Sequence, residues 1–196
     1  MVKADLVKRL REKTGVGMMT CKEALKESGG DMEKAIEILR KKGEAKAFKH
    51  AGKTAKEGLV GSYIHLGGKI GVLLELSCET DFAAKSEDFK ELLKDISMHI
   101  AASNPLYVKR EDIPNEVIAK EKEIFKAQVQ NKPPQAVDKI VDGKMDKFYT
   151  EVCLMEQPFV KNTNTTVKEH IVSYVAKIGE NIVVRRFTRY QVGEEI

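Results

Sequence analysis

Few residues of this sequence have the type and spacing that chemistry requires. The three cysteines are far apart and odd in number, which favours reduced thiols over a disulfide framework or a paired-cysteine metal site. The histidines show no HExxH or i, i+4 spacing, so no metal site is predicted. These residues are Cys21, Cys78, Cys153, His50, His65, His99 and His170. The pair Gly67-Gly68 lacks the context of a phosphate-binding loop and precedes a strand, which indicates a turn.

Cys78 is the candidate for a nucleophile. With His65 or His99 it could form a thiolate pair, but it falls on the core face of a predicted strand, where a buried thiol is unreactive. We therefore expect no catalytic residue, no cofactor and no metal, and we expect that the chain is not an enzyme.

Two groups of residues could instead contact a partner. The segment SCETDF, residues 77–82, places two carboxylates, a threonine and a phenylalanine just after a strand. These side chains could cap the next helix with the phenylalanine turned inward, or they could form a contact site. Met18-Met19 is expected in a loop between two helices, where methionine suits a protein-binding surface but could also plug a small core. Spacing alone leaves both pairs of alternatives open.

Composition indicates a soluble, folded protein of 196 residues, of which 42% are hydrophobic and 33% charged. No apolar run reaches the roughly 18 to 20 residues that span a bilayer, and the first residues lack the apolar core of a secretory signal. We therefore expect a cytoplasmic protein with no membrane contact. The net charge of +4 is mild and does not require an acidic partner. Aromatic residues make up only 6% of the chain and tryptophan is absent, so no stacking platform for bases is present and no direct nucleic-acid contact is expected. The lysines of residues 44–57 and the arginines of residues 185–189 leave a minor RNA-binding role as an alternative.

Glycines divide residues 1–43 into three short helices. The first helix is expected to end in the stretch Thr14–Gly17, the second at Gly29-Gly30 and the third at Gly43. Thr20-Cys21-Lys22-Glu23 has the form of a capping box that opens the second helix, and Asp31 is a suitable N-cap for the third. We expect a three-helix head that, with the basic connector after it, makes up residues 1–52.

A β-hairpin follows, because the apolar period changes from helical to two. Leu59–Leu66 and Lys69–Cys78 are the expected strands, joined by glycines that can take the positive φ of a tight turn. A two-residue turn pairs His65 with Ile70. The core face of the second strand then carries Ile70, Val72, Leu74, Leu76 and Cys78.

The rest of the chain predicts helices around one further strand. The expected elements are a helix over Phe89–Ile100, a helical hairpin at about 112–155 with a turn at Pro133-Pro134, a helix opened by Thr166 and ended by Gly179, and a strand over Ile182–Val192. The last strand is expected to join the hairpin in a three-stranded antiparallel sheet. The fold class is α+β, with a small helical head and a helical-hairpin arm.

Four segments together resemble the bacterial elongation factor Ts family. In chain order they are Thr14–Leu25 (TGVGMMTCKEAL), Cys78–Phe82 (CETDF), Glu156–Val160 (EQPFV) and Lys177–Ile182 (KIGENI). Their order, and their spread over the whole chain, make this resemblance far more specific than any single motif.

The resemblance implies a guanine-nucleotide exchange factor for elongation factor Tu, the GTPase that delivers aminoacyl-tRNA to the ribosome. Residues matching Thr80, Asp81, Phe82 and Ala83 would form a tip that disturbs the magnesium and phosphate site of the GTPase. Met18 and Met19 would fall at contact positions of a head like ubiquitin-associated domains. Residues 53–196 would form the core, or dimerisation, domain.

At this length the chain resembles the short form of the family, with one core module. Two copies joined through the sheet edge near Ile182–Val192 would then give a two-plus-two complex with the GTPase. Thr188 leaves no thiol at that position for a covalent pair. The main rival hypothesis is a ubiquitin-associated-like binding module without exchange activity.

Overall fold

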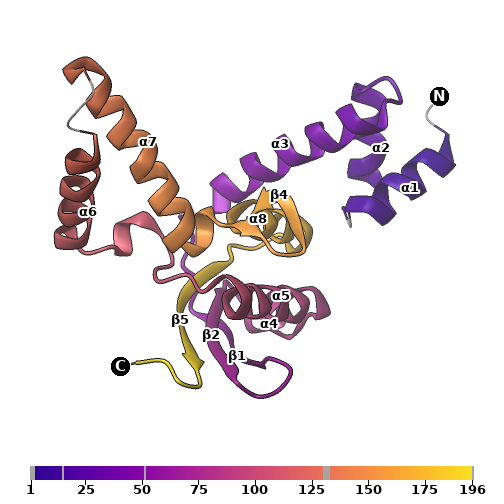
Figure 1. Cartoon of the computed structure of the whole chain (residues 1–196). Helices are drawn as coiled ribbons and strands as arrows, with labels where there is room; N and C mark the ends of the chain where they lie inside the picture. Colours follow the sequence, from indigo (N-terminus) through magenta and orange to yellow (C-terminus); the bar gives the residue numbers. More distant parts are fainter. Residues whose placement is uncertain (1–2, 15, 51, 130–132, 196) are drawn as a thin grey trace. The chain divides into compact units, whose positions relative to one another are not determined.

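The structure, a computed structural model, describes residues 3–14, 16–50, 52–129 and 133–195. Figure 1 shows its elements, and three helices precede the first strand. In chain order they are α1 (Ala4–Thr14), α2 (Met18–Glu27), α3 (Met32–His50), β1 (Glu57–Ile64), β2 (Ile70–Cys78), α4 (Asp81–Lys85), α5 (Glu87–Ser103), η1 (Arg110–Asp112), α6 (Asn115–Gln128), α7 (Pro134–Val152), η2 (Leu154–Glu156), β3 (Pro158–Phe159), β4 (Asn162–Thr166), α8 (Val167–Ile178) and β5 (Val183–Gln191). The predicted α+β class is confirmed.

The predicted three-stranded sheet is present, with the strand order β1-β2-β5. Its hairpin has the predicted register, because the amide of His65 donates to the carbonyl of Ile70 at 2.9 Å. Gly67 and Gly68 have positive φ, as the turn requires. The expected core face of β2 is buried at Val72, Leu74, Leu76 and Cys78, whereas Leu73 on the other face is half exposed.

Contacts group the chain into two compact units. The first consists of Met1–Val60, Glu75–Leu93 and Glu169–Val183, and the second of Gly61–Leu74, Lys94–Lys168 and Val184–Ile196. Each unit draws on segments that are far apart in the chain. These contact groups do not test the expected domain boundary near residue 52, which stays a prediction.

In the first unit, α1, α2 and α3 enclose a small core of their own. Its buried side chains are Val7, Leu10, Cys21, Ala24, Leu25, Ala35 and Leu39. Asp31 caps α3 as predicted, since its Oδ1 accepts hydrogen bonds from the amides of Glu33 and Lys34 at 3.0 and 3.1 Å. Gly29 and Gly30, both with positive φ, follow α2 as expected.

Two predicted helix boundaries are wrong. α2 begins at Met18 with Gly17 as its N-cap, so Thr20 lies inside the first turn and is not a capping residue. The amide of Cys21 already donates to the carbonyl of Gly17 at 3.0 Å, so the helix starts before the expected box. α3 continues past Gly43 to His50. It packs closely against α8 at Gly43, since a Cβ added there would lie 3.4 Å from the Cβ of Ala176. The end of α1 is as predicted, because the helix stops at Thr14, the first residue of the stretch expected to end it; Gly15 in that stretch lies outside the described residues.

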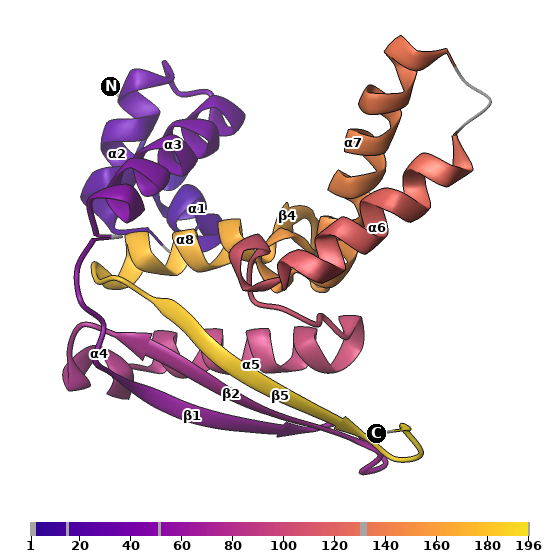
Figure 2. The ribbon, with the colours of Figure 1, turned by 90° about the vertical axis from the view of Figure 1, so that its left-hand side faces the viewer.

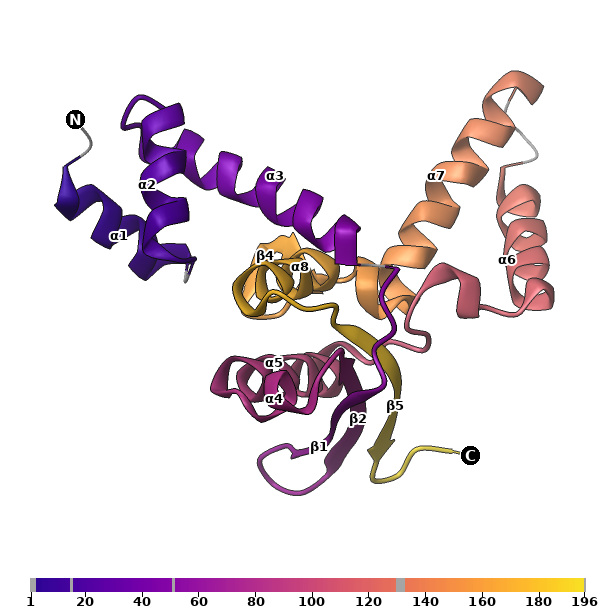
Figure 3. The same ribbon diagram turned by 180° about the vertical axis from the view of Figure 1, so that it is seen from behind.

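The second unit contains most of the sheet and the arm. Figure 2 shows the second half of α5 running along β2 and β5. Ile96 and Ile100, two residues of the predicted apolar stripe of α5, are fully buried. α6 and α7 lie side by side as the predicted helical hairpin (Figure 3) and bury Val129, Val141 and Met145 between them.

A two-stranded ribbon in the second unit was not predicted. β3 and β4 pair antiparallel, with Pro158 opposite Thr166 and Phe159 opposite Asn162. The sequence of β4, NTNTT, has no apolar alternation, so it lacks the usual signal of a strand. α8 begins at the predicted position and is followed by Gly179 with a φ of +87°.

Candidate partner-binding tip

The candidate tip is a single helical turn that joins β2 to α5. Thr80 has extended backbone angles and is the N-cap of α4, and its Oγ1 accepts a hydrogen bond from the amide of Ala83 at 3.2 Å. Ala83 and Ala84 are buried and form the inner face of this turn. Phe82 points the other way, with 83% of its surface exposed. The alternative of a helix cap with the phenylalanine turned inward holds only in part: the cap is formed, but Phe82 is not turned inward. The alternative of a contact site stays a prediction.

Asp81 is an exposed carboxylate beside Phe82. Its Oδ2 lies 2.7 Å from Nζ of Lys85, one turn along α4. The hydrogen bond and the charge of Lys85 lower the pKa of Asp81, so its carboxylate is ionised at neutral pH. Thr80 supplies the cap of α4, and the Asp81 carboxylate pairs with Lys85 at the surface.

The base of the tip is held by residues that the sequence analysis did not assign to it. Glu180, in the loop between α8 and β5, accepts hydrogen bonds from the amide and the hydroxyl of Thr80 at 3.0 and 2.7 Å. Glu79 accepts one from the amide of Asn181 at 2.7 Å. The only sequence signal for these partners was their presence in the segments CETDF and KIGENI, which lie a hundred residues apart.

Glu79 is ionised and mostly enclosed, with 19% of its side chain exposed. Burial works against its ionisation, but the hydrogen bonds from His50 Nδ1, the Asn181 amide and Lys53 Nζ outweigh it and lower the pKa of Glu79 to about 2. The His50 and Lys53 bonds are 2.8 and 3.0 Å long. These contacts join the end of α3 and the connector after it to the base of the tip.

Cys78 is a buried structural thiol, as predicted. Its Sγ donates to the carbonyl of Thr80 at 3.1 Å, and burial raises its pKa to about 11. The proposed histidine partner His99 has another role. Because the amide of Val160 donates to its Nδ1 at 3.2 Å, His99 is the neutral tautomer that donates from Nε2 to Oε1 of Gln157, 2.8 Å away.

Met18 and Met19, the candidate contact residues of the head, are exposed over 54% and 66% of their surfaces. They are the first two residues of α2, so the prediction that they lie in a loop is wrong. Their exposure also shows that they do not plug the head core. The structure thus places the candidate residues in two groups on separate elements, Thr80–Ala83 at α4 and the methionines on α2.

Among residues 3–14, 16–50, 52–129 and 133–195, no cluster of three or more histidine, cysteine or acidic side chains could hold a metal ion. No described helix is both long and apolar enough to cross a membrane.

Phe82 is an exposed aromatic side chain on a capped turn whose inner face is buried, and such side chains are common at protein-binding surfaces. Similarity to known proteins shows the class to which this chain belongs. Residues 5–194 match the family model described as Elongation factor TS, and the chain belongs to this family of translation elongation factors. The resemblance seen in the sequence is confirmed.

Three relatives illustrate the match, each carrying the name Elongation factor Ts. The chain is 61% identical to the protein of Thermodesulfovibrio yellowstonii over 194 residues, which cover 98% of this chain and 97% of the relative. It is 61% identical to that of Moorella thermoacetica over 198 residues, which cover 100% of this chain and 98% of the relative. It is 55% identical to that of Thermotoga maritima over 193 residues, which cover 98% and 97%.

Proposed function

We propose that this protein binds elongation factor Tu in its GDP form and promotes GDP release, after which GTP rebinds. The observation that carries the proposal is Phe82, an aromatic side chain 83% exposed on a turn whose inner face is buried. A fold gains nothing from exposing such a side chain, whereas a partner groove can bury it.

The mechanism follows from how a GTPase holds its nucleotide. GDP is bound largely through Mg²⁺ and backbone donors around its phosphates, so an aromatic wedge that shifts those groups weakens the nucleotide without touching its base. Phe82 is the wedge, and the ionised Asp81 brings a carboxylate to the magnesium site. Thr80 and Ala83 shape the turn that carries both residues.

Linkage sets the direction of exchange. The factor must bind the nucleotide-free GTPase more tightly than the loaded one, and by reciprocity the rebinding nucleotide expels the factor. Nothing in this cycle requires a covalent step, so the protein acts as an exchange factor and not as an enzyme. The proposed location is the cytoplasm, where translation takes place. It contacts neither nucleic acid nor membrane directly.

Met18 and Met19 are proposed as a second contact with the GTPase. Both side chains are exposed at the start of α2, and methionine adapts its shape to a partner surface. In this division of roles, residues 1–52 are the head and its connector, residues 53–196 are the core, and the arm lies at about 112–155.

A symmetric pair of factors is the proposed assembly, which gives a two-plus-two complex. Among the described strands, β5 lies at an edge of the sheet, next to β2. Ile64, Leu73, Tyr190 and Val192 are exposed around the same end of the sheet. An edge strand beside apolar side chains is a suitable pairing surface. Light scattering during size-exclusion chromatography at micromolar concentration should give the mass of a dimer; a strict monomer, both alone and in the complex, would reject it.

The exchange activity is tested with elongation factor Tu that carries a fluorescent GDP. The protein should speed the release of GDP, and Phe82→Ala should strongly reduce this effect while circular dichroism stays unchanged. If release is no faster than the spontaneous rate, the function is wrong. If Phe82→Ala accelerates release as well as the unchanged protein, the mechanism is wrong, and the rival binding module without exchange activity is favoured.

A further inference from the structure

Two dipeptides hold each other at the base of the tip in a reciprocal pattern. Glu79 accepts a hydrogen bond from the amide of Asn181, and Glu180 accepts one from the amide of Thr80. Each glutamate therefore binds the backbone of the residue that follows the other glutamate. We call this arrangement of Glu79, Thr80, Glu180 and Asn181 the glutamate clasp.

The clasp also determines where the hydroxyl proton of Thr80 points. Oγ1 of Thr80 lies 2.7 Å from Oε1 of Glu180 and accepts the Ala83 amide at 3.2 Å. The hydroxyl of Thr80 has a single proton, and it donates that proton to Glu180. A lone pair of Oγ1 is then left for the Ala83 amide, which makes Glu180 part of the cap of α4.

One carboxylate of the clasp, that of Glu79, also contacts groups from another part of the first unit. Nζ of Lys53 and Nδ1 of His50 both contact Glu79. The side-chain amide of Asn181 donates to the carbonyl of Lys53 at 2.8 Å, which ties the connector to the clasp a second time. The entry to α4 is thus held from two directions.

We propose that Glu180 and Glu79 are positioning residues for Phe82, which hold the start of α4 so that the aromatic side chain is presented in one orientation. This inference rests on the proposed exchange function.

The physical reason is the length of α4. A helix of five residues cannot sustain itself, because forming a first turn is unfavourable without further contacts. Phe82 is the second residue of that turn and gains no support from its own exposed side chain. Its orientation therefore depends on the cap before it and on the buried alanines after it, and the clasp holds the cap. Groups that act in binding work best when such supporting contacts fix them beforehand.

The test measures GDP release from elongation factor Tu as a function of factor concentration. Glu180→Ala should lower the maximal rate at saturating factor by roughly ten- to a hundredfold, the range expected when a working group is misplaced by about 1 Å. Half-saturation should change little, because the methionines of the head are untouched. Glu79→Ala should act in the same direction.

A double variant separates positioning from a general loss of structure. If Glu180 acts through Phe82, then adding Glu180→Ala to Phe82→Ala should lower the rate no further. If the two losses multiply instead, Glu180 acts by some other route and the inference is overturned.

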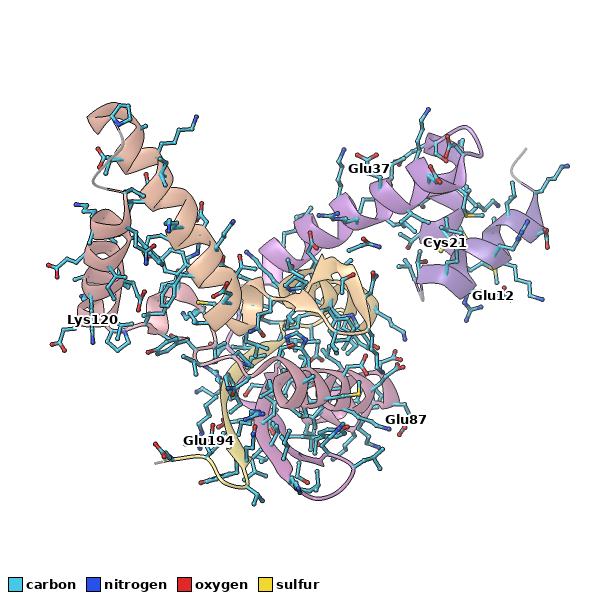
Figure 4. The ribbon with its side chains drawn as sticks, in the orientation of Figure 1. Glu12, Cys21, Glu37, Glu87, Lys120 and Glu194 are labelled. Carbon is cyan, nitrogen blue, oxygen red and sulfur yellow. The ribbon has the colours of Figure 1, made fainter. Side chains whose placement is uncertain are left out.

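Glu87 supplies the matched control. It lies at the exposed start of α5 (Figure 4), 91% of its side chain is accessible, and it pairs with Lys90. Glu87→Ala should exchange nucleotide like the unchanged protein. If the unchanged protein fails to accelerate release, the proposed function fails; if it succeeds, and Glu180→Ala matches it at saturation, only the positioning role fails.

Discussion

Phe82 is 83% exposed, and Phe89, seven residues later, is completely buried. The two side chains belong to adjacent helices, α4 and α5, that follow β2. An apolar core therefore lies close to this segment, but only Phe89 is buried in it. Burying an aromatic side chain of this size stabilises a protein by about 1.5 to 3 kcal/mol. The exposure of Phe82 is consequently a cost to folding that a partner surface would offset.

The cap of α4 predicts a difference between two substitutions of Thr80. Thr80→Ser keeps the hydroxyl that binds the Ala83 amide and Glu180, whereas Thr80→Val keeps the shape and loses both bonds. Loss of an N-cap costs about 1 kcal/mol, so amide hydrogen exchange at Ala83 and Ala84 should speed up several-fold in Thr80→Val only. Equal protection in the two variants would show that the hydroxyl does not hold the turn.

Glu79 predicts how stability depends on acid. Its pKa in the folded protein is about 2, below its ordinary value of 4.5. A carboxyl group with a depressed pKa adds stability that is complete above 4.5 and is lost as the pH falls towards 2. Urea unfolding measured between pH 5 and pH 2 should therefore show a steeper decline for the unchanged protein than for Glu79→Gln. Parallel declines would mean that the ion pairs of Glu79 do not contribute.

Gly58 should not tolerate a side chain. A Cβ at this position would lie 2.2 Å from the carbonyl oxygen of Leu76 and 2.7 Å from Cα of Ser77, and its φ is +148°. Gly58→Ala should lower the free energy of unfolding by more than about 2 kcal/mol, because both the clash and the backbone strain act against folding. Gly67→Ala is the control, since its φ is also positive but its Cβ would meet no atom within 4 Å. Its loss should stay nearer 1 kcal/mol.

Gly43 should behave in the opposite way. It lies inside α3, and a Cβ there would make an ordinary contact with Ala176 at 3.4 Å. Gly43→Ala should raise the free energy of unfolding by up to about 1 kcal/mol, because alanine has the higher helix propensity. Gly43→Leu should lower it, since a larger side chain overlaps with α8. Chemical denaturation measures the free energy of unfolding of both variants. A loss of stability in Gly43→Ala would contradict the prediction that a methyl group fits between α3 and α8.

Much of the fold could be predicted because it depends on local patterns. The alternation in Ile70–Cys78 specified which face of β2 is buried, and the register of the hairpin followed from its two glycines. The prolines and apolar stripes of the arm specified α6 and α7 in the same way. The failure at Gly43 has a tertiary cause: glycine is a local signal for a helix end, but α3 packs against α8 at that residue. At Thr20 the pattern of a capping box was present, but α2 begins two residues earlier, at Met18.

In the candidate site, too, local features could be predicted and long-range contacts could not. By itself, the sequence determined that an acidic and aromatic segment follows a buried strand, and its motifs determined the family. Only the tertiary structure decided that Phe82 faces outward, that Thr80 and not Asp81 supplies the cap, and that Glu180 holds Thr80. Periodicity carries information over one or two turns of chain, whereas hydrogen bonds between residues a hundred positions apart exist only once the chain has folded.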